Sequence, residues 1–359
     1  MKLTDLIPPP EYLMMRGVGI DVSDRSIKFV EFEKNKSYLR LKKFGEEILE
    51  EGIIINGEIK KKEELVSFLK KIRQVRGFTH VVFSLPEEKA FLSLVELPKM
   101  SEEEIKISLS FQIEQYVPLK KENIIFDFEI TSSSLKSDHF DVLLLAFPKN
   151  IVYDYYEVFE RAGFAPIAIE LESLSLARSL VPEDNKENIL IIDFGKTRTT
   201  FSVLRGHSLR FTSTIPLGGR DLEKLIARAM GVNPFEAEKI KKDFSLTGLK
   251  KKGGIYEAIL PILSSLEDEI RKHQDYWQNH LLHQSKEKSG IKEIILAGGD
   301  ANLSGLPEYL SQRLLIPARL GNPWIKVGSF EDYVPEIRKS ESLAYSVAIG
   351  LALRGFQGE

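Results

Sequence analysis

The sequence predicts an α/β protein made of two lobes that face each other across a cleft. One observation is a hairpin at residues 189–204, in which four apolar residues lead to Asp193, a polar turn and a returning strand. A second is a similar hairpin at residues 18–30, where the acid is Asp21. Two copies of one hairpin in one chain indicate an internal duplication, and hence two related domains.

The two hairpins match position by position. When Asp21 is aligned on Asp193, Ser23 falls on Gly195 and the return strands start at the same offset. An acid at the exposed end of a buried strand, beside a turn with free backbone N–H groups, suits a metal ion bound to phosphate. A single such hairpin is equally explained by a capped turn without a ligand. The pair favours a ligand, because each lobe then offers one acid and one turn to the cleft.

Composition excludes several classes of protein. The chain has 359 residues, of which 43% are hydrophobic and 29% charged, so it is long enough for two domains and is not disordered as a whole. A net charge of −3 gives no basic field for nucleic acid, and the lack of cysteine excludes disulfides, zinc–thiolate sites and thiol catalysis. No apolar run approaches the ~20 residues of a membrane span, and no signal peptide is evident. We therefore expect a cytoplasmic protein that reaches a membrane only through a partner or a peripheral contact.

The first lobe follows an N-terminal arm at residues 1–16, whose three consecutive prolines favour an extended chain. We expect this arm to pack on the body, with docking to a partner or membrane surface as the alternative. The periodicity of apolar residues then predicts a helix at 62–76 and buried strands at 80–85 and 165–171.

A small inserted subdomain is expected at residues 86–149. Its pattern is a strand at 90–97, a helix that starts at Ser101, and two strands at 124–130 and 140–147. Glu104 lies three residues after Ser101, which completes a capping box. The terminal hairpin could leave an edge strand open to another chain.

Two helices rich in small residues, at 172–180 and 341–354, are expected to pack closely. If they cross between the lobes, they form a hinge. The first lobe is expected to end near Pro182.

The second lobe carries two glycine-rich turns. Gly218 and Gly219 precede a helix at 222–230, where backbone N–H groups can bind phosphate, or where Asp221 simply caps the helix. Gly298 and Gly299 follow the strand at 291–297, and their lack of a side chain lets a flat ring lie against the backbone.

Further helices are predicted in this lobe. They lie at 235–244, at 255–283, and at 305–315 with Ser304 as its cap. Three histidines on the long helix, His273, His280 and His283, lack a nearby acid pair, so we expect them on a solvated face and not at a metal site.

The order of these elements resembles the superfamily of actin, hexokinase and heat-shock-cognate ATPases. Within it, the chain is similar to the PilM family of type IV pilus assembly proteins, and the insert lies where the cell-division protein FtsA carries its distinctive subdomain. The similar stretches are FQIEQYVP at 111–118, IILAGG at 294–299 with Gly305-Leu306 and Ile316-Pro317 after it, and AIGLALR at 348–354. The resemblance spans residue 17 to the C-terminus.

The resemblance implies an actin-like (ribonuclease H-like) two-lobed ATPase fold with an FtsA-type inserted subdomain. It assigns residues 17–85, 150–183 and 336–359 to the first lobe, 86–149 to the insert, and 184–335 to the second lobe, with a small subdomain at about 220–290.

It also implies that the cleft binds ATP and Mg²⁺. Asp21 and Asp193 would hold the Mg²⁺ through water, and Glu172 would orient the attacking water; a structural alternative for Glu172 is an acid that matches the helix dipole. The remaining cofactor-binding residues would be Ser23, Arg25, Ser26, Gly195, Lys196 and Thr197 at the phosphates, Glu238 and Lys241 at ribose and adenine, and Gly218, Gly219, Gly298 and Gly299 around the nucleoside.

Three positions depart from the common pattern of the superfamily. Ser23 stands where many relatives have glycine, Lys196 brings a bulky cation into the second phosphate turn, and Asp300 puts an acid where a small residue is usual. We expect these residues to affect turnover more than binding, so that ATP binds tightly and is hydrolysed slowly or not at all.

The expected function is that of a nucleotide-regulated scaffold at the cytoplasmic face of the inner membrane. Its partners would be the cytoplasmic N-terminal segment of a PilN-like membrane protein, bound in a groove between the first lobe and the insert, and other components of the pilus platform, with self-association allowed. The alternatives are an FtsA-like division filament, which the lack of a C-terminal amphipathic helix disfavours, and a small-molecule kinase of the same superfamily. No acid of a kinase substrate pocket is evident.

Overall fold

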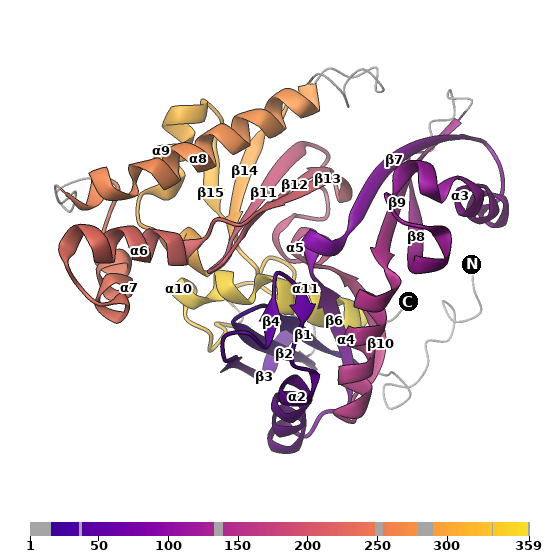
Figure 1. The fold of residues 1–359 in the computed structure, drawn as a ribbon, viewed down its shortest axis with the longest axis horizontal. Helices are drawn as coiled ribbons and strands as arrows, with labels where there is room; N and C mark the ends of the chain where they lie inside the picture. Colours follow the sequence, from indigo (N-terminus) through magenta and orange to yellow (C-terminus); the bar gives the residue numbers. More distant parts are fainter. Residues whose placement is uncertain are drawn as a thin grey trace.

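Two five-stranded sheets with the same topology form the frame of the molecule (Figure 1). The computed structural model describes residues 16–357 apart from 36–37, 133–138, 248–253, 279–289 and 332. The first sheet has the order β10-β6-β1-β2-β3, and the second the order β13-β12-β11-β14-β15. The strands are β1 (Val18–Val22), β2 (Ser26–Asn35), β3 (Tyr38–Ile48), β6 (His80–Leu85), β10 (Ala165–Leu171), β11 (Asn188–Phe194), β12 (Thr199–Arg205), β13 (Ser208–Ile215), β14 (Glu293–Ala297) and β15 (Ala318–Leu320).

Each sheet is built around its first strand. β1 pairs antiparallel with β2 and parallel with β6, and β11 pairs antiparallel with β12 and parallel with β14. Asp21 lies opposite Lys28 and Asp193 lies opposite Thr200, so both acids occupy the same place in their hairpins. The duplication expected from the two hairpins is thus present in the sheets, and the α/β prediction is confirmed.

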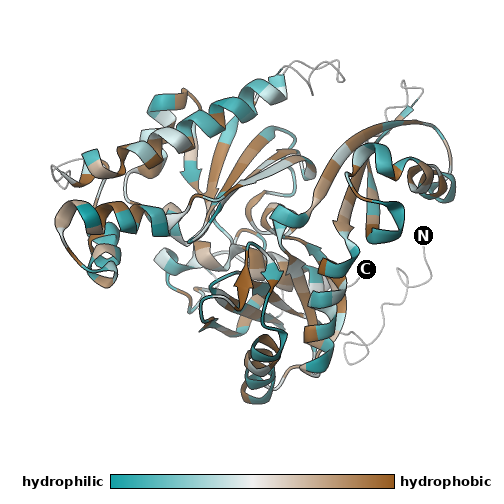
Figure 2. Cartoon of the chain, in the orientation of Figure 1, coloured by the Kyte–Doolittle hydropathy of each residue, from teal (hydrophilic) through white to brown (hydrophobic). Residues whose placement is uncertain are grey.

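Alternate side chains of β11 pack on opposite faces of the second sheet. Ile189 and Ile191 belong to the core shared with the first lobe, whereas Leu190 and Ile192 pack with the outer helices. These helices are α6 (Gly219–Met230), α7 (Pro234–Asp243), α8 (Ile255–Tyr276) and α9 (Leu306–Leu314). The continuous apolar run is therefore explained by burial on both faces, as Figure 2 shows in brown for the central strands.

The first lobe is covered by α2 (Lys62–Arg76) and α4 (Lys149–Arg161), with a short hairpin of β4 (Ile54–Ile55) and β5 (Glu58–Ile59). The apolar stripe of α2 packs into the first core through Leu65, Leu69 and Ile72, as its periodicity predicts. Trp324 and Val327 pack beside β2 and β3, and the carbonyl of Val327 accepts a hydrogen bond from the Leu39 N–H at 2.8 Å. The lobe boundaries remain a prediction, and Trp324 and Val327 lie within the range 184–335 assigned to the second lobe yet pack on the first.

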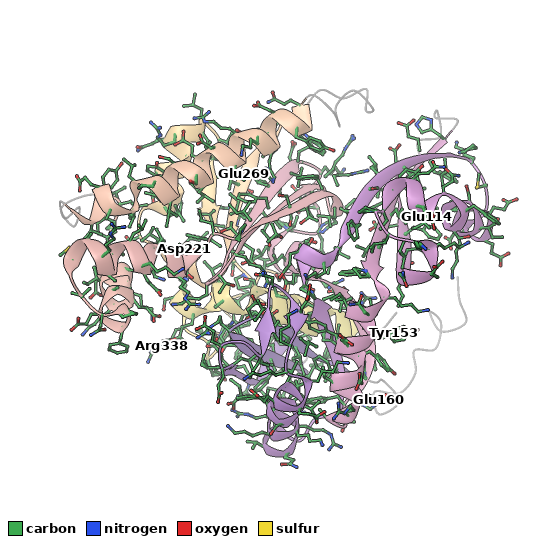
Figure 3. All side chains as sticks on the ribbon, in the orientation of Figure 1. Glu114, Tyr153, Glu160, Asp221, Glu269 and Arg338 are labelled. Atoms are coloured by element: carbon green, nitrogen blue, oxygen red, sulfur yellow. The ribbon has the colours of Figure 1, made fainter. Side chains whose placement is uncertain are left out.

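The insert is a three-stranded sheet with one helix. After η2 (Glu87–Lys89) come β7 (Phe91–Pro98), α3 (Glu102–Tyr116), η3 (Lys121–Asn123), β8 (Ile124–Ser132) and β9 (His139–Pro148), in the sheet order β7-β9-β8. The predicted capping box is present: the Glu104 N–H donates to Ser101 Oγ at 3.3 Å, and the Ser101 N–H donates to Glu104 Oε2 at 2.8 Å. β8 lies at an edge of this sheet. On the surface, the charged side chains of Glu114 on α3 and of Glu160 on α4 point outward (Figure 3).

Two helices join the lobes at the back of the molecule. α5 (Glu172–Leu180) and α11 (Ser346–Gln357) pack so closely that a β-carbon on Gly350 would lie within 3.0 Å of the Ser175 carbonyl. α11 also packs on β1, where a β-carbon on Gly19 would lie within 3.0 Å of the Ala348 backbone. The close contact expected from the small residues is therefore present, and Figure 1 shows α11 between the lobes.

The C-terminal helix differs from the prediction. Instead of one helix at 341–354, the chain forms α10 (Lys339–Ser342), η7 (Leu343–Tyr345) and then α11. The Leu343 carbonyl accepts from the Gly298 N–H at 3.3 Å and from Ser346 Oγ at 2.9 Å. These bonds hold the start of the predicted helix against the second lobe. The backbone there forms the 3-10 turn η7 and not a continuous α-helix.

Two predicted helix caps are also wrong. α9 starts after Gly305, whose φ is +84°, while Ser304 is held by Ser245 through their hydroxyl groups at 3.1 Å. α6 starts at Gly219, so Asp221 lies at the third position and accepts from the Gly218 N–H at 3.1 Å.

Of the three histidines predicted on a solvated face, His273 is buried. Its ring lies between Phe201 and Phe211, and burial lowers its pKa. His280 and His283, with the end of the predicted long helix and most of the loop at 247–254, lie outside the described residues, as does nearly all of the N-terminal arm.

Candidate functional site

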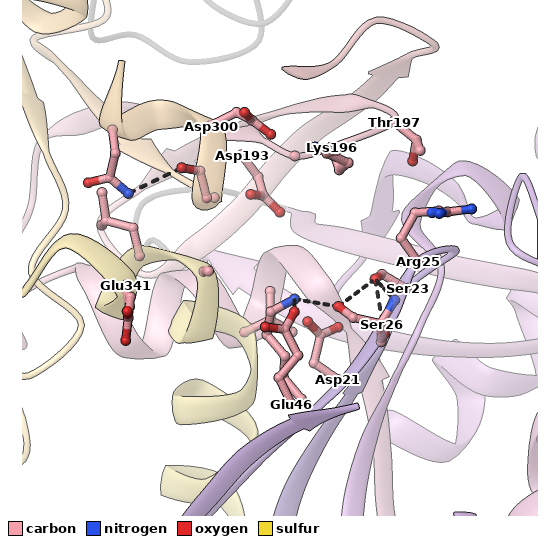
Figure 4. A pocket seen from close by; sticks show the side chains of 18 of the residues that line it. Asp21, Ser23, Arg25, Ser26, Glu46, Asp193, Lys196, Thr197, Asp300 and Glu341 are labelled. Carbon is pink, nitrogen blue, oxygen red and sulfur yellow. Dashed lines mark hydrogen bonds and ion pairs between the residues drawn. The ribbon is translucent and has the colours of Figure 1, made fainter. Parts of the chain in front are cut away.

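A cleft of about 780 Å³ opens between the two sheets where β1 and β11 end (Figure 4). Asp21 reaches it from the first lobe and Asp193 from the second, and their carboxylates point toward each other. Asp21 lies near the end of β1 and Asp193 near the end of β11, at the edge of each sheet where the parallel strands end. The paired hairpins thus bring the two acids into one cavity.

The two aspartates are desolvated and repel each other. Burial raises the pKa of Asp21 above its usual value, although Lys28 and Arg198 oppose the rise, and Ser84 Oγ donates to its Oδ1 at 3.3 Å. Burial and the charge of Asp21 raise the pKa of Asp193 to about 6. Among the described residues no cation forms an ion pair with Asp193. Two desolvated carboxylates of this kind fit a hard divalent cation such as Mg²⁺, which prefers oxygen ligands.

The turn after β1 is held by its own serines. The Ser23 N–H donates to the Ser26 carbonyl at 2.9 Å, and the Ser26 N–H donates to Ser23 Oγ at 3.3 Å. Lys28 donates to Ser26 Oγ at 2.7 Å and pairs with Glu46 at 3.2 Å. Ser23 therefore supplies a hydroxyl to the turn, and Lys28 adds a cation to the cleft.

The turn after β11 is tied to the start of α6. The Gly195 N–H donates to the Arg198 carbonyl at 3.0 Å, while the carbonyls of Gly195 and Lys196 accept from the N–H groups of Gly219 and Arg220 at 2.9 and 2.8 Å. A β-carbon on Gly218 would lie within 3.0 Å of both carbonyls. Gly218 permits this close approach, and the Gly-Gly turn thus lies behind the turn after β11.

An alternating cluster of charges lies on the second-lobe side of the cleft. Glu223 Oε1 accepts from Lys196 Nζ and Lys241 Nζ, each at 2.6 Å, and Lys241 also pairs with Asp300. Glu238 lies 3.7 Å from Lys196 Nζ. Burial lowers the pKa of Lys241, but Asp300 and Glu223 outweigh burial and raise it above its usual value. Lys196 is therefore held against the wall of the cleft by Glu223 and does not fill it.

Glu172 is the first residue of α5 and lines the cleft. Its Oε1 accepts from Arg198 Nη2 at 2.9 Å. Burial raises the pKa of the Glu172 carboxyl well above its usual range, and the guanidinium of Arg198 opposes that rise. The residue implied as the one that orients water is thus already bound by an arginine.

The structure gathers most of the predicted site residues in the cleft. It is lined by Asp21, Ser23, Arg25, Ser26, Glu172, Asp193, Gly195, Lys196, Thr197, Glu238, Lys241, Gly298 and Gly299. Gly218 and Gly219 do not line it: they are buried behind it, and Gly219 lies against the carboxylate of Asp300.

Sequence reasoning missed several lining residues, namely Lys28, Glu46, Arg198, Thr200, Asn302 and Glu341. Lys28 and Thr200 could have been found from the hairpin register, because they lie opposite Asp21 and Asp193. Glu46 and Glu341 come from distant segments, and no local pattern singles them out.

Comparisons with known proteins place this geometry in a family. The family model described as "Type IV pilus assembly protein PilM" matches residues 19–356. A solved "PilM-PilN type IV pilus biogenesis complex" is 24% identical, with a TM-score of 0.79 over 96% of this chain and 99% of that chain. MreB5 of Spiroplasma citri bound to AMPPNP is 13% identical, with a TM-score of 0.56 and 96% of both chains covered. These likenesses establish the actin-like fold.

The curated relatives are cell-division proteins. FtsA of Pseudomonas aeruginosa is 27% identical over 214 residues, which are 55% of this chain and 49% of that protein. FtsA of Escherichia coli K12 is 27% identical over 226 residues, with 56% and 51% covered. The chain spans about half the length of the curated relatives it matches. Because the family model covers nearly the whole chain, the protein belongs to the PilM family of type IV pilus assembly proteins.

Proposed function

We propose that this protein is an ATP-binding scaffold of the type IV pilus assembly platform, held at the cytoplasmic face of the inner membrane by a PilN-like partner. The observation that carries the nucleotide part is the pair Asp21 and Asp193, one buried and one partly buried acid that face each other across one cleft. Among the described residues, no helix has the length and apolar character needed to cross a bilayer. Membrane placement through a partner is consistent with that finding.

In this proposal each lobe binds part of MgATP. Asp21 and Asp193 would hold the metal through water. The bound metal would neutralise charge on the phosphates. Ser23, Arg25 and Ser26 face the phosphates from the first lobe. Gly195, Lys196 and Thr197 face them from the second lobe, Glu238 and Lys241 lie by the sugar and base, and Gly298 and Gly299 leave room for the nucleoside.

The nucleotide-binding proposal is tested by isothermal titration of ATP with Mg²⁺. Wild-type protein is expected to bind, and Asp21→Ala and Asp193→Ala are each expected to lose most of the affinity, because a charge-neutralising ligand is removed. Glu63→Ala is the matched control, since Glu63 is an exposed acid on α2 whose ion pair is with Arg161. Absence of binding by the wild-type protein, or unchanged binding by either aspartate variant, would refute the proposal.

The partner is proposed to bind between the first lobe and the insert. β8 and β10 are edge strands of their sheets, and α4 contacts both strands. Tyr153 and Tyr156 of α4 are 54% and 39% exposed, and Tyr153 points outward beside the insert in Figure 3. An extended peptide could pair with an edge strand while its apolar side chains contact these tyrosines.

This part is tested with a fluorescent peptide from the cytoplasmic N-terminus of a PilN-like protein. The wild-type protein is expected to bind it, and Tyr153→Asp is expected to weaken binding by about tenfold, a loss of about 1.4 kcal/mol. Phe235→Asp is the control, because Phe235 is also an exposed aromatic residue, at 79%, but lies on α7 of the other lobe. If both variants bind as the wild-type protein does, this docking face is wrong.

A filament-forming protein of the FtsA type is the second candidate, because FtsA proteins match more than half of the chain. Two apolar side chains on the outer face of α3 in the insert, Ile107 and Phe111, are 57% and 79% exposed. Sedimentation with MgATP tests this candidate: polymer that is lost in Phe111→Asp would favour a filament over a monomeric scaffold.

A further inference from the structure

Arg198 joins the second lobe to two acids of the first lobe and one acid at the start of the insert. It lies on the turn between β11 and β12, and its side chain is 14% exposed. Nη2 contacts Glu172 Oε1 at 2.9 Å, and Nη1 lies 3.0 Å from Glu88 Oε1 and 3.5 Å from Asp24 Oδ1. These acids come from the start of α5, from η2 and from the turn after β1. One guanidinium thus binds carboxylates from three separate segments.

The start of α5 is fixed from another side as well. Glu87 is 2% exposed, and its oxygens accept from the Ser173 N–H at 3.1 Å and from Ser173 Oγ at 2.9 Å. Ser173 follows Glu172 in the chain, so these bonds fix the backbone from which the Glu172 side chain reaches Arg198. A carboxylate orients water only through an oxygen that faces it and has a free lone pair. In Glu172, a charge-assisted bond to Arg198 uses one oxygen and fixes the direction of the other.

We propose that Arg198 is a positioning residue that withholds Glu172 from the attacking water and so keeps ATP hydrolysis slow. This inference rests on the proposed binding of MgATP. In this proposal Arg198, on the turn after β11, makes turnover slow. Asp21, Asp193 and the turns after β1 and β11 still bind the nucleotide. Glu88 and Asp24 hold the guanidinium in place beside Glu172.

The test is a double-mutant cycle on single-turnover hydrolysis of MgATP. Arg198→Gln is expected to raise the rate by about tenfold or more, since a positioned general base contributes roughly 100- to 10,000-fold. The rise is expected to disappear in Arg198→Gln/Glu172→Gln, because the released carboxylate is then absent. Arg198 opposes the burial that raises the pKa of Glu172, so in Arg198→Gln this carboxyl ionises only at higher pH, and the rise in rate is expected to be largest at alkaline pH.

The matched control is Arg220→Gln. Arg220 also joins the lobes, through Glu51 at 2.8 Å, but it does not touch Glu172. Its removal is expected to leave the hydrolysis rate unchanged. A rise in Arg220→Gln equal to that in Arg198→Gln would overturn the inference, because any loosening of the lobes would then suffice.

Removal of a buried arginine leaves three acids without their cation, and Arg198→Gln could fail to fold. Arg198→Lys keeps the charge but lacks the planar five-donor fork of the guanidinium, so it is expected to hold Glu172 less firmly and to give a smaller rise that also depends on Glu172. An unchanged rate in every folded Arg198 variant, or a rise that survives in the double variant, overturns the inference. Calorimetry on each variant separates the two proposals: if MgATP binds but hydrolysis does not respond, only the role of Arg198 is wrong, whereas no binding by the wild-type protein overturns both.

Discussion

Gly298 lies so close to Asp193 that a β-carbon at residue 298 would come within 3.0 Å of the aspartate Oδ1. It would also come within 3.0 Å of the Phe194 carbonyl, and the φ of Gly298 is +86°. Only glycine combines this conformation with this approach. The turn after β14 is therefore shaped around the acid at the end of β11.

We expect Gly298→Ala to weaken binding of MgATP and to destabilise the fold, because the new methyl group must displace Asp193 or the backbone of Phe194. The expected loss of unfolding free energy exceeds the ~1–3 kcal/mol of a strained backbone conformation alone, because Gly298 combines φ +86° with ψ 159°. Thermal melting and calorimetry measure the two effects. Gly231→Ala is the control, since Gly231 has φ +66° with no atom within 4 Å of an added β-carbon, and it should lose stability without losing nucleotide affinity.

The pH dependence of metal binding should follow Asp193. Its pKa is raised to about 6, so below that pH a proton competes with Mg²⁺ for the carboxylate. We expect Mg²⁺-dependent ATP affinity to fall by up to about tenfold per pH unit below this value. Calorimetry at pH 7.5, 6 and 5 tests this, and equal affinity at all three values would contradict it.

The raised pKa of Asp193 also affects the stability of the ligand-free protein, and there the dependence on pH has the opposite sign. Because the folded-state pKa of Asp193 lies above the ordinary value of 3.8, the folded protein binds more protons than the unfolded chain between these values. The contribution of this group to stability should therefore fall as pH rises from about 4 to about 6 and stay constant above that. In Asp193→Asn, urea unfolding should lose this component of the pH dependence.

Glu170 is a buried acid shared by two arginines from different helices. Its oxygens accept from Arg178 of α5 and, at 2.6 Å, from Arg354 of α11, so it ties both connecting helices to β10. We expect Glu170→Gln to cost about 3–5 kcal/mol of unfolding free energy, because two partly buried cations lose their partner. Glu63→Gln, which breaks the exposed pair with Arg161, should cost less than about 1 kcal/mol. Similar losses in the two variants would show that the buried network contributes little.

The crossing of α5 and α11 depends on Gly350. An alanine there would bring its β-carbon into the carbonyl of Ser175, so the helices must separate. We expect Gly350→Ala to lower the unfolding free energy by about 2 kcal/mol or more, despite the higher helix propensity of alanine, which alone would add about 1 kcal/mol. If melting shows a net gain in stability, the helices do not touch as described.

Much of the frame could be predicted from local patterns. The run at 189–192 is apolar on every residue and forms a strand buried on both faces, and Ser101 with Glu104 forms the predicted capping box. These features depend on neighbours within a few residues, which the sequence lists directly. The repeat of the hairpin also placed Asp21 and Asp193 correctly, because each sheet repeats the same order of strands.

The rest depends on contacts between distant segments. The break between α10 and α11 follows from a bond between Gly298 and Leu343, and Ser304 fails to cap α9 because Ser245 holds it.

The sequence by itself determined the duplicated α/β frame and the two acids of the cleft, because strand periodicity and the position of an acid at a strand end are local properties. Only the tertiary structure decided that Glu172 is bound by Arg198, that Lys241 is paired with Asp300, and that Gly219 lies behind the cleft. The physical reason is that the partner of a buried charge is set by which segments the fold brings within hydrogen-bonding distance, and these partners are 26 and 59 residues apart in the chain.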